Sequence, residues 1–261
     1  MGLQSLRAED LRRLGRLHSV EEGRRAFEIA KDCFNRVSFD LIYARQDQTL
    51  PDWKDELREA LSLAGDHLSL YQLTIEAGTA FGDRFERGLL RGLPHDDDAA
   101  DMYEVTREIC AEFGLFDYEV SNYARPGAES RHNLIYWHYG DYVGVGPGAH
   151  GRVTINGQRH ASDTFKQPGK WLEAVKQGTG EKLFDPISPT EQANEYLMMC
   201  LRLTEGVDMA RFETLGGKPL DPATLKDLEQ MGMITVESPY VKATHQGRLV
   251  LNAVIAELLL D

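Results

Sequence analysis

The chain has 261 residues, of which 42% are hydrophobic and 27% are charged, a balance typical of folded globular proteins. Its formal net charge of −13 argues against a general nucleic-acid-binding protein, which needs clustered lysine and arginine side chains. No apolar run has the length of a membrane span, and the first ten residues are polar rather than signal-like. Cys33, Cys110 and Cys200 lie far apart, which argues against a disulfide framework and favours a reducing, cytoplasmic location.

The first half of the chain alternates between short runs rich in β-branched and aromatic residues and longer runs with helical periodicity. Thr49 can cap a helix that has Pro51 in its first turn, and Gly114 can end a later helix. Strands that alternate with helices predict a parallel sheet, either open or closed into a barrel. The predicted strands cover residues 36–43, 67–75 and 116–123, and the predicted helices cover residues 21–33, 51–64 and 96–113.

The first residues suggest that the barrel is incomplete. Residues 1–5 resemble the end of a strand that is already under way, and a helical pattern follows at once. A parallel barrel that began here would lack its first strands. We therefore expect a partial parallel (β/α) barrel in a chain that is truncated at its N-terminus.

The second half follows a different pattern. Residues 131–151 are crowded with His, Tyr, Trp and Gly and match neither the helical nor the strand period. After a short helix at 171–177, the pattern predicts a small winged-helix-like domain. Its predicted helices cover residues 191–203, 209–215 and 222–231, its strands cover 234–236 and 240–243, and its last helix covers 244–260. It shows no basic DNA-recognition helix, because the segment 225–231 contains Lys226 but also Asp227 and Glu229, so packing is the favoured role. We expect three parts, at residues 1–130, 131–185 and 186–261.

Two features of the sequence allow both a structural and a functional interpretation. Asp40 lies inside an apolar strand, where a carboxylate needs a ligand or an ionic partner. The run Gly-Val-Gly-Pro-Gly-Ala-His-Gly at 144–151 permits close backbone approach to a ligand, but tight turns alone would explain it.

The segment His-Asn-Leu-Ile-Tyr-Trp at 132–137 has a composition that suits haem. Haem needs an axial ligand, an apolar and aromatic surface, and polar contacts for its propionates. His132 offers an imidazole, and Arg125 and Arg131 are candidates to meet carboxylates. An aromatic core with an incidental histidine explains the same composition.

Several motifs together resemble a known family. Gly-Leu-Gln-Ser at 2–5, Leu-Gly-Arg-Leu-His at 14–18 and Ser-Phe-Asp-Leu-Ile-Tyr at 38–43 resemble the second half of a radical-SAM barrel of the oxygen-independent coproporphyrinogen oxidase family. Tyr-Glu-Val-Ser-Asn-Tyr-Ala at 118–124, the haem-like segment and the glycine-rich run resemble its HemW branch specifically. This resemblance extends over essentially the whole chain.

The resemblance implies two binding sites. The first holds S-adenosylmethionine through Gln4, Arg16, Asp40, Thr74 and His150. The second binds haem through the H-N-x-x-Y-W motif, with His132 as the axial ligand of the iron and with Asn133, Tyr136 and Trp137 beside it.

The chain departs from the family at two places. It lacks the C-x-x-x-C-x-x-C loop that binds a [4Fe–4S] cluster in the family. It also reads Ala-Arg-Gln-Asp at 44–47, where the family has a Gly-Leu-Pro-Gly-like turn before Gln-Thr. The missing cluster loop favours a radical-SAM oxidoreductase relative without catalytic turnover.

The function implied by the resemblance is that of a haem chaperone that delivers haem to recipient haemoproteins. The alternative is a fragment of an oxygen-independent coproporphyrinogen III oxidase-like enzyme of porphyrin biosynthesis. The expected partners are haem and recipient haemoproteins, and not nucleic acid. A peripheral membrane contact or a homodimer remains open.

Overall fold

The computed structural model describes residues 1–260. The chain divides into two compact units, Met1–Glu129 and Ser130–Asp261. The three-part division expected from the sequence stays a prediction. Among the described residues, no helix is long and apolar enough to cross a membrane.

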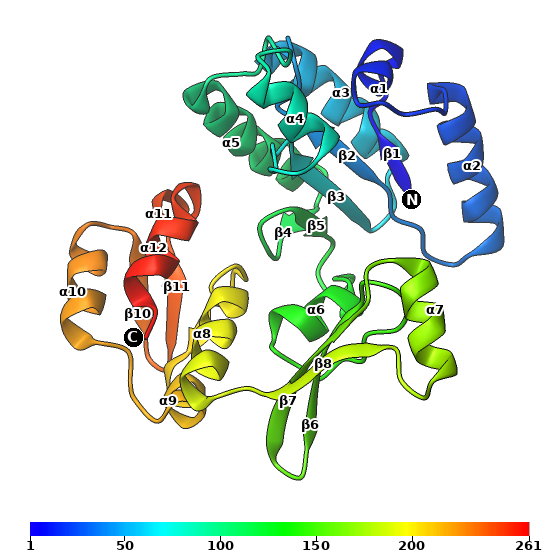
Figure 1. Ribbon diagram of the computed structural model, residues 1–261. Helices are drawn as coiled ribbons and strands as arrows, with labels where there is room; N and C mark the ends of the chain where they lie inside the picture. The colour runs from blue at the N-terminus through cyan, green and yellow to red at the C-terminus, as the bar shows by residue number, and fades with distance from the viewer. Residues whose placement is uncertain (261) are drawn as a thin grey trace. The chain divides into compact units, whose positions relative to one another are not determined.

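The first unit contains a five-stranded sheet with the order β1-β2-β3-β5-β4 (Figure 1). Strands β1, β2 and β3 run parallel, which confirms the prediction for the first two strands joined by a crossover helix. The elements of this unit are β1 Gly2–Gln4, α1 Ala8–Arg13, α2 Val20–Cys33, β2 Asp40–Tyr43, α3 Leu50–Leu63, β3 His67–Gln72, α4 Ala80–Glu86, α5 Asp96–Glu112, β4 Phe116–Asp117 and β5 Asn122–Ala124.

The third predicted strand is wrong in both shape and direction. The segment that was expected to be one parallel strand forms β4 and β5, a hairpin in which β5 pairs antiparallel with β3. The polar residues of the segment explain the turn: Ser121 Oγ donates to Glu119 Oε1 at 3.4 Å, and Asn122 Nδ2 also donates to Glu119. The sheet is therefore mixed, and its closure into a barrel stays a prediction.

The two faces of this sheet differ in character. Leu41 and Leu70 are register partners on the face that packs against α3 and α5, and both side chains are buried. Trp53 of α3 lies in the same core, where its Nε1 donates to Thr106 Oγ1 at 2.8 Å. On the opposite face, Asp40 is the register partner of Ser69, and both are only half-buried. The core is thus built on one face, and polar groups collect on the other.

Helix α3 begins as the sequence predicts. Thr49 accepts a hydrogen bond from Asp52 N at 3.3 Å, and the Asp52 side chain returns a contact to Thr49, which completes a capping box. The loop before it contains Ala44 and Asp47, which adopt φ values of 56° and 57°. Glycine adopts this left-handed conformation without strain, whereas alanine and aspartate adopt it at a cost in free energy.

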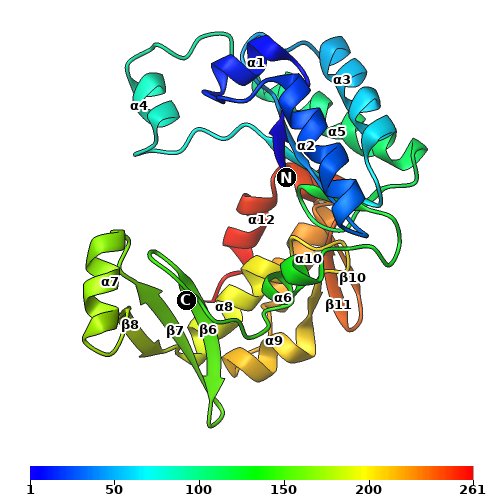
Figure 2. The ribbon, with the colours of Figure 1, turned by 90° about the vertical axis from the view of Figure 1, so that its right-hand side faces the viewer.

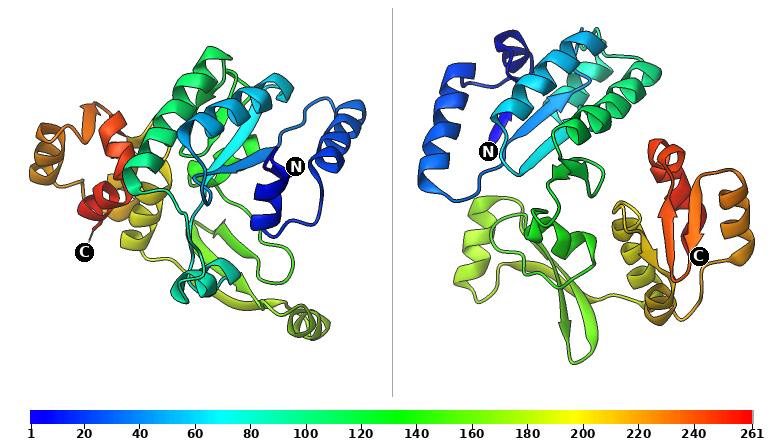
Figure 3. Two further views of the ribbon diagram at one scale, coloured as in Figure 1. Left: turned by 90° about the horizontal axis from the view of Figure 1, so that it is seen from above. Right: turned by 180° about the vertical axis from the view of Figure 1, so that it is seen from behind.

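The second unit contains two three-stranded antiparallel sheets. The sheet β6-β7-β8 stands beside helix α7 in Figure 2, and β9, β10 and β11 form the other sheet, seen from behind in Figure 3. The elements are α6 Arg131–Trp137, β6 His150–Ile155, β7 Gln158–Thr164, α7 Pro168–Lys176, β8 Glu181–Pro186, α8 Pro189–Cys200, β9 Val207–Asp208, α9 Met209–Gly216, α10 Pro222–Gln230, β10 Ile234–Glu237, β11 Tyr240–Ala243, α11 His245–Leu249 and α12 Leu251–Leu258.

The sequence predictions for this unit hold for helices better than for strands. Helices α8, α9 and α10 and the hairpin β10–β11 lie close to their predicted ranges. The sheet β6-β7-β8 was not predicted, and neither was helix α6, which lies in the region that matched neither period. The expected single helix at 244–260 is two helices, because Val250 adopts φ −119° and ψ 30°, which interrupts the helical backbone. The winged-helix resemblance stays a prediction.

Candidate functional site

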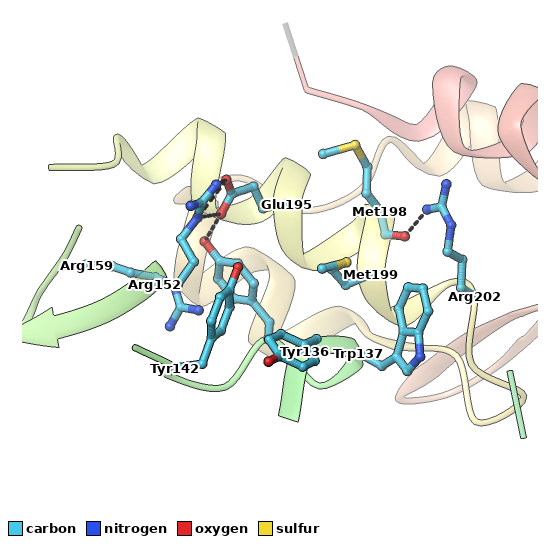
Figure 4. A pocket seen from close by; sticks show the side chains of 10 residues that line it. Tyr136, Trp137, Tyr142, Arg152, Arg159, Glu195, Met198, Met199 and Arg202 are labelled. Carbon is cyan, nitrogen blue, oxygen red and sulfur yellow. Dashed lines mark hydrogen bonds and ion pairs between the residues drawn. The ribbon is translucent and has the colours of Figure 1, made fainter. Parts of the chain in front are cut away.

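The second unit contains a cavity of about 390 Å³, within the range that proteins use for small ligands. Most of its lining is aromatic or thioether, and the remainder is charged (Figure 4). We call it the aromatic cavity, and its lining residues are Tyr136, Trp137, Tyr139, Tyr142, Arg152, Arg159, Glu195, Met198, Met199 and Arg202.

Helix α6 carries the segment that the sequence analysis singled out as suited to haem. The Ser130 side chain accepts a hydrogen bond from Asn133 N at 3.3 Å and so caps the helix. One helical turn separates His132 from Tyr136, whose hydroxyl lies 3.1 Å from His132 Nε2. Tyr136 and Trp137 line the cavity, whereas His132 is exposed and does not.

Helix α8 supplies residues that the sequence analysis missed. Glu195, Met198 and Met199 lie at helical spacings of three and four residues, and Arg202 follows at the same spacing just after the helix. This spacing was visible in the sequence as an acid, two methionines and an arginine on one helical face. The methionines are the stronger signal, because Met198 is exposed rather than buried in a core.

A charged network forms one wall of the aromatic cavity. The Arg152 guanidinium donates to both Glu195 carboxylate oxygens, from Nη2 at 2.7 Å and from Nε at 3.1 Å. The Tyr139 hydroxyl donates to Glu195 Oε2 at 2.8 Å, and burial together with this carboxylate raises the pKa of Tyr139. The Arg159 guanidinium lies 3.8 Å from the centre of the Tyr139 ring and pairs with Asp141.

The arginines that line the cavity are not those that the sequence suggested. Arg131 is exposed at the first position of α6, and Arg125 belongs to the first unit. Arg152 and Arg159 instead come from β6 and β7, the strands that periodicity did not reveal.

The other predicted residues of the second unit lie outside this lining. His138 forms an ion pair with Glu205 when it is protonated. His150 is exposed, with its Nδ1 3.8 Å from Asp163 Oδ1. The glycine run serves close packing, because a Cβ atom at Gly144 would lie 2.4 Å from the His150 carbonyl oxygen.

Three of the residues that the resemblance assigns to S-adenosylmethionine come together on the polar face of the first sheet. Burial raises the pKa of Asp40, while the charge of the N-terminal ammonium group, a hydrogen bond from the Gln4 side chain and the nearby charge of Arg16 oppose this rise. Gln4 has a φ of 64° at a bulge in β1, a conformation that strains a residue other than glycine. Its Oε1 is buried and has no hydrogen-bond partner among the described residues.

Thr74 is the other residue of the first unit that the resemblance assigns to S-adenosylmethionine. Thr74 is exposed two residues beyond the end of β3, and its hydroxyl donates to Gln72 O at 3.2 Å. Within residues 1–260, no group of three or more His, Cys, Asp or Glu side chains could hold a metal ion.

The fold matches that of a solved radical-SAM enzyme. The structure of Escherichia coli coproporphyrinogen III oxidase HemN superposes with a TM-score of 0.77, covers 99% of this chain and 63% of that chain, and shares 19% sequence identity. Residues 187–250 match the HemN C-terminal domain family. These two matches define the class as a HemN-like radical-SAM fold.

Similarity to named relatives narrows the class. The heme chaperone HemW of Bacillus subtilis (strain 168) is 34% identical, over 99% of this chain and 68% of its own length. The heme chaperone HemW of Escherichia coli (strain K12) is 35% identical, over 98% of this chain and 66% of its own length. The mitochondrial radical S-adenosyl methionine domain-containing protein 1 of Danio rerio is 34% identical, over 100% of this chain and 61% of its own length. The chain belongs to the HemW family, and it spans roughly two thirds of the length of these relatives.

Proposed function

We propose that this chain is a HemW-like haem chaperone that binds haem in the aromatic cavity and delivers it to recipient haemoproteins. The observation that carries the proposal is the position of Tyr136 and Trp137. These two residues of the H-N-x-x-Y-W motif lie in a cavity that also presents two methionines and three arginines. Aromatic rings and thioethers suit the macrocycle, and guanidinium groups suit its propionates.

The axial ligand in this proposal is His132. Its imidazole lies one turn from Tyr136, and the Tyr136 hydroxyl contacts its Nε2, so the residue that touches the ligand-binding histidine also lines the cavity. The ring is exposed and therefore accessible to iron.

A haem titration followed by the Soret band tests the proposal. His132→Ala is expected to lose most of the affinity or to change the spectrum. His138→Ala is the matched control, because it removes an exposed imidazole from the residue after the same helix and should bind like the wild type. Equal binding by the wild type, His132→Ala, His138→Ala and His150→Ala would disprove a haem site at the motif. Transfer to an excess of an apo-haemoprotein then tests delivery.

We also propose that the first unit retains contacts for S-adenosylmethionine. The donor set fits polar parts of that cofactor, because Gln4 Oε1 is a buried acceptor without a partner among the described residues and Asp40 lies beside it. Gln4, Asp40 and Arg16 would hold it, and when bound with a cluster it would supply radical chemistry. The residues Gln4, Arg16 and Asp40 are also compatible with the alternative function, that of a fragment of a coproporphyrinogen oxidase-like enzyme.

The proposal also covers the partners and the cellular location of the protein. Its partners are haem and the recipient haemoproteins. The three cysteines are free thiols, which suits a reducing compartment, and we extend the proposal to the cytoplasm.

A further inference from the structure

The charges that line the aromatic cavity do not balance. Arg152 is paired with Glu195, and Arg159 is paired with Asp141. Arg202 also lines the cavity, yet it forms no ion pair with any residue between 1 and 260. One positive charge therefore remains without a carboxylate.

The surroundings of Arg202 hold its side chain in place without neutralising it. Its Nη2 donates to Asn252 Oδ1 at 3.1 Å, and its Nη1 donates to the carbonyl oxygen of Met198. Both acceptors are neutral, and burial lowers the pKa of Arg202 with no opposing contribution from an acid. A half-buried guanidinium that keeps its charge in such a place gains free energy from an anion.

The position of Arg202 fits one particular kind of anion. Figure 4 shows the Arg152–Glu195 pair at one end of the cavity and Arg202 at the opposite end, with Met198, Met199 and the aromatic side chains among the lining between them. A ligand that fills this space needs an apolar body and an anionic group at its edge. A guanidinium binds a planar carboxylate through two parallel hydrogen bonds.

We propose that Arg202 binds a carboxylate of the ligand in the aromatic cavity, so that the site selects flat apolar molecules with an acidic edge. This inference rests on the proposed function, because the carboxylate it invokes is a propionate of haem. It assigns to Arg202 the role of distinguishing an acidic porphyrin from its esterified form, a role separate from iron ligation.

The test uses porphyrins without iron, so that His132 takes no part. The full chain is titrated with protoporphyrin IX and with its dimethyl ester in one detergent-containing buffer, and binding is followed by porphyrin fluorescence. The wild type should prefer the acid, and Arg202→Gln should weaken binding of the acid by roughly ten- to a hundredfold while leaving the ester unchanged. Arg202→Lys keeps a positive charge and should restore part of this affinity.

Arg131→Gln serves as the control, because Arg131 is exposed on α6 and does not line the cavity. Unchanged binding of protoporphyrin IX by a folded Arg202→Gln protein would overturn the inference. Equal affinities of the wild type for acid and ester would overturn it as well, even if Arg202→Gln failed to fold. Haem binding that depends on His132 but not on Arg202 would contradict this inference and leave the proposed axial ligand intact. Haem binding that depends on Arg202 but not on His132 would contradict only the proposed axial ligand.

Discussion

His67 is a buried histidine with a partner on each ring nitrogen. Ser38 Oγ lies 2.7 Å from its Nδ1, and the Tyr118 hydroxyl lies 2.9 Å from its Nε2. The ring is 7% exposed, and burial lowers its pKa below the ordinary value. The folded protein therefore favours the neutral ring, because the imidazolium would lose its hydration in this position.

This burial makes stability depend on pH. Below the ordinary histidine pKa of about 6.5, the unfolded chain binds a proton that folded His67 does not, so the free energy of unfolding falls as pH falls through this window. The loss is complete below the lowered pKa of the folded state. Denaturant unfolding between neutral and mildly acidic pH should show this slope in the wild type and a smaller one in His67→Gln. Ser38→Ala, which removes only a neutral partner, should lower stability yet keep the slope. An identical slope in His67→Gln would refute the assignment.

At the scale of single elements, α8 depends on its N-cap residue, Ser188. The Ser188 side chain accepts a hydrogen bond from Glu191 N at 3.3 Å, and Glu191 Oε2 accepts one from Ser188 N at 2.9 Å. This capping box begins the helix that carries Glu195, Met198 and Met199 into the aromatic cavity. The cap thus stabilises both the helix and the wall of the proposed site.

Ser188→Ala should therefore destabilise the chain by about 1 kcal/mol, because Glu191 N loses its acceptor. Chemical denaturation measures the change. Ser188→Asp supplies another good N-cap acceptor and should remain within a few tenths of a kcal/mol of the wild type. A loss in the aspartate variant equal to that in the alanine variant would show that the hydroxyl contributes something other than the cap.

For the molecule as a whole, ligand count predicts that no iron–sulfur cluster assembles. Cys33 lies on α2, Cys110 is buried on α5 and Cys200 is buried on α8. Burial raises the pKa of Cys110 well above its usual range and that of Cys200 to about 12, so both resist conversion to the thiolate that iron requires.

After anaerobic reconstitution, the chain should carry no stoichiometric iron and sulfide and should not cleave S-adenosylmethionine. Iron and sulfide assays, together with the visible spectrum, measure cluster content. Release of 5′-deoxyadenosine measures cleavage of S-adenosylmethionine. Stoichiometric iron and sulfide with a broad charge-transfer band would contradict the ligand count.

The sequence by itself determined the features that depend on neighbouring residues. Thr49 and Pro51 specify the start of α3, and the order of the strands and helices before residue 116 specifies the parallel pairing of β2 and β3. The family motifs, which are also local, identified the membership that the comparisons confirm.

Only the tertiary structure decided the features that join distant residues. The pairing of β5 with β3 joins Ala124 to His67, and the pairing of β8 with β7 joins Phe184 to Ser162, so no local period reveals either pairing. The ion pair between Arg152 of β6 and Glu195 of α8 also joins residues 43 positions apart, and both side chains line the cavity together with Tyr136. Ion pairs and cavities depend on three-dimensional proximity, whereas caps and periodicity act within a few residues, so the sequence singled out the segment 132–137 but not the cavity that Tyr136 and Trp137 line.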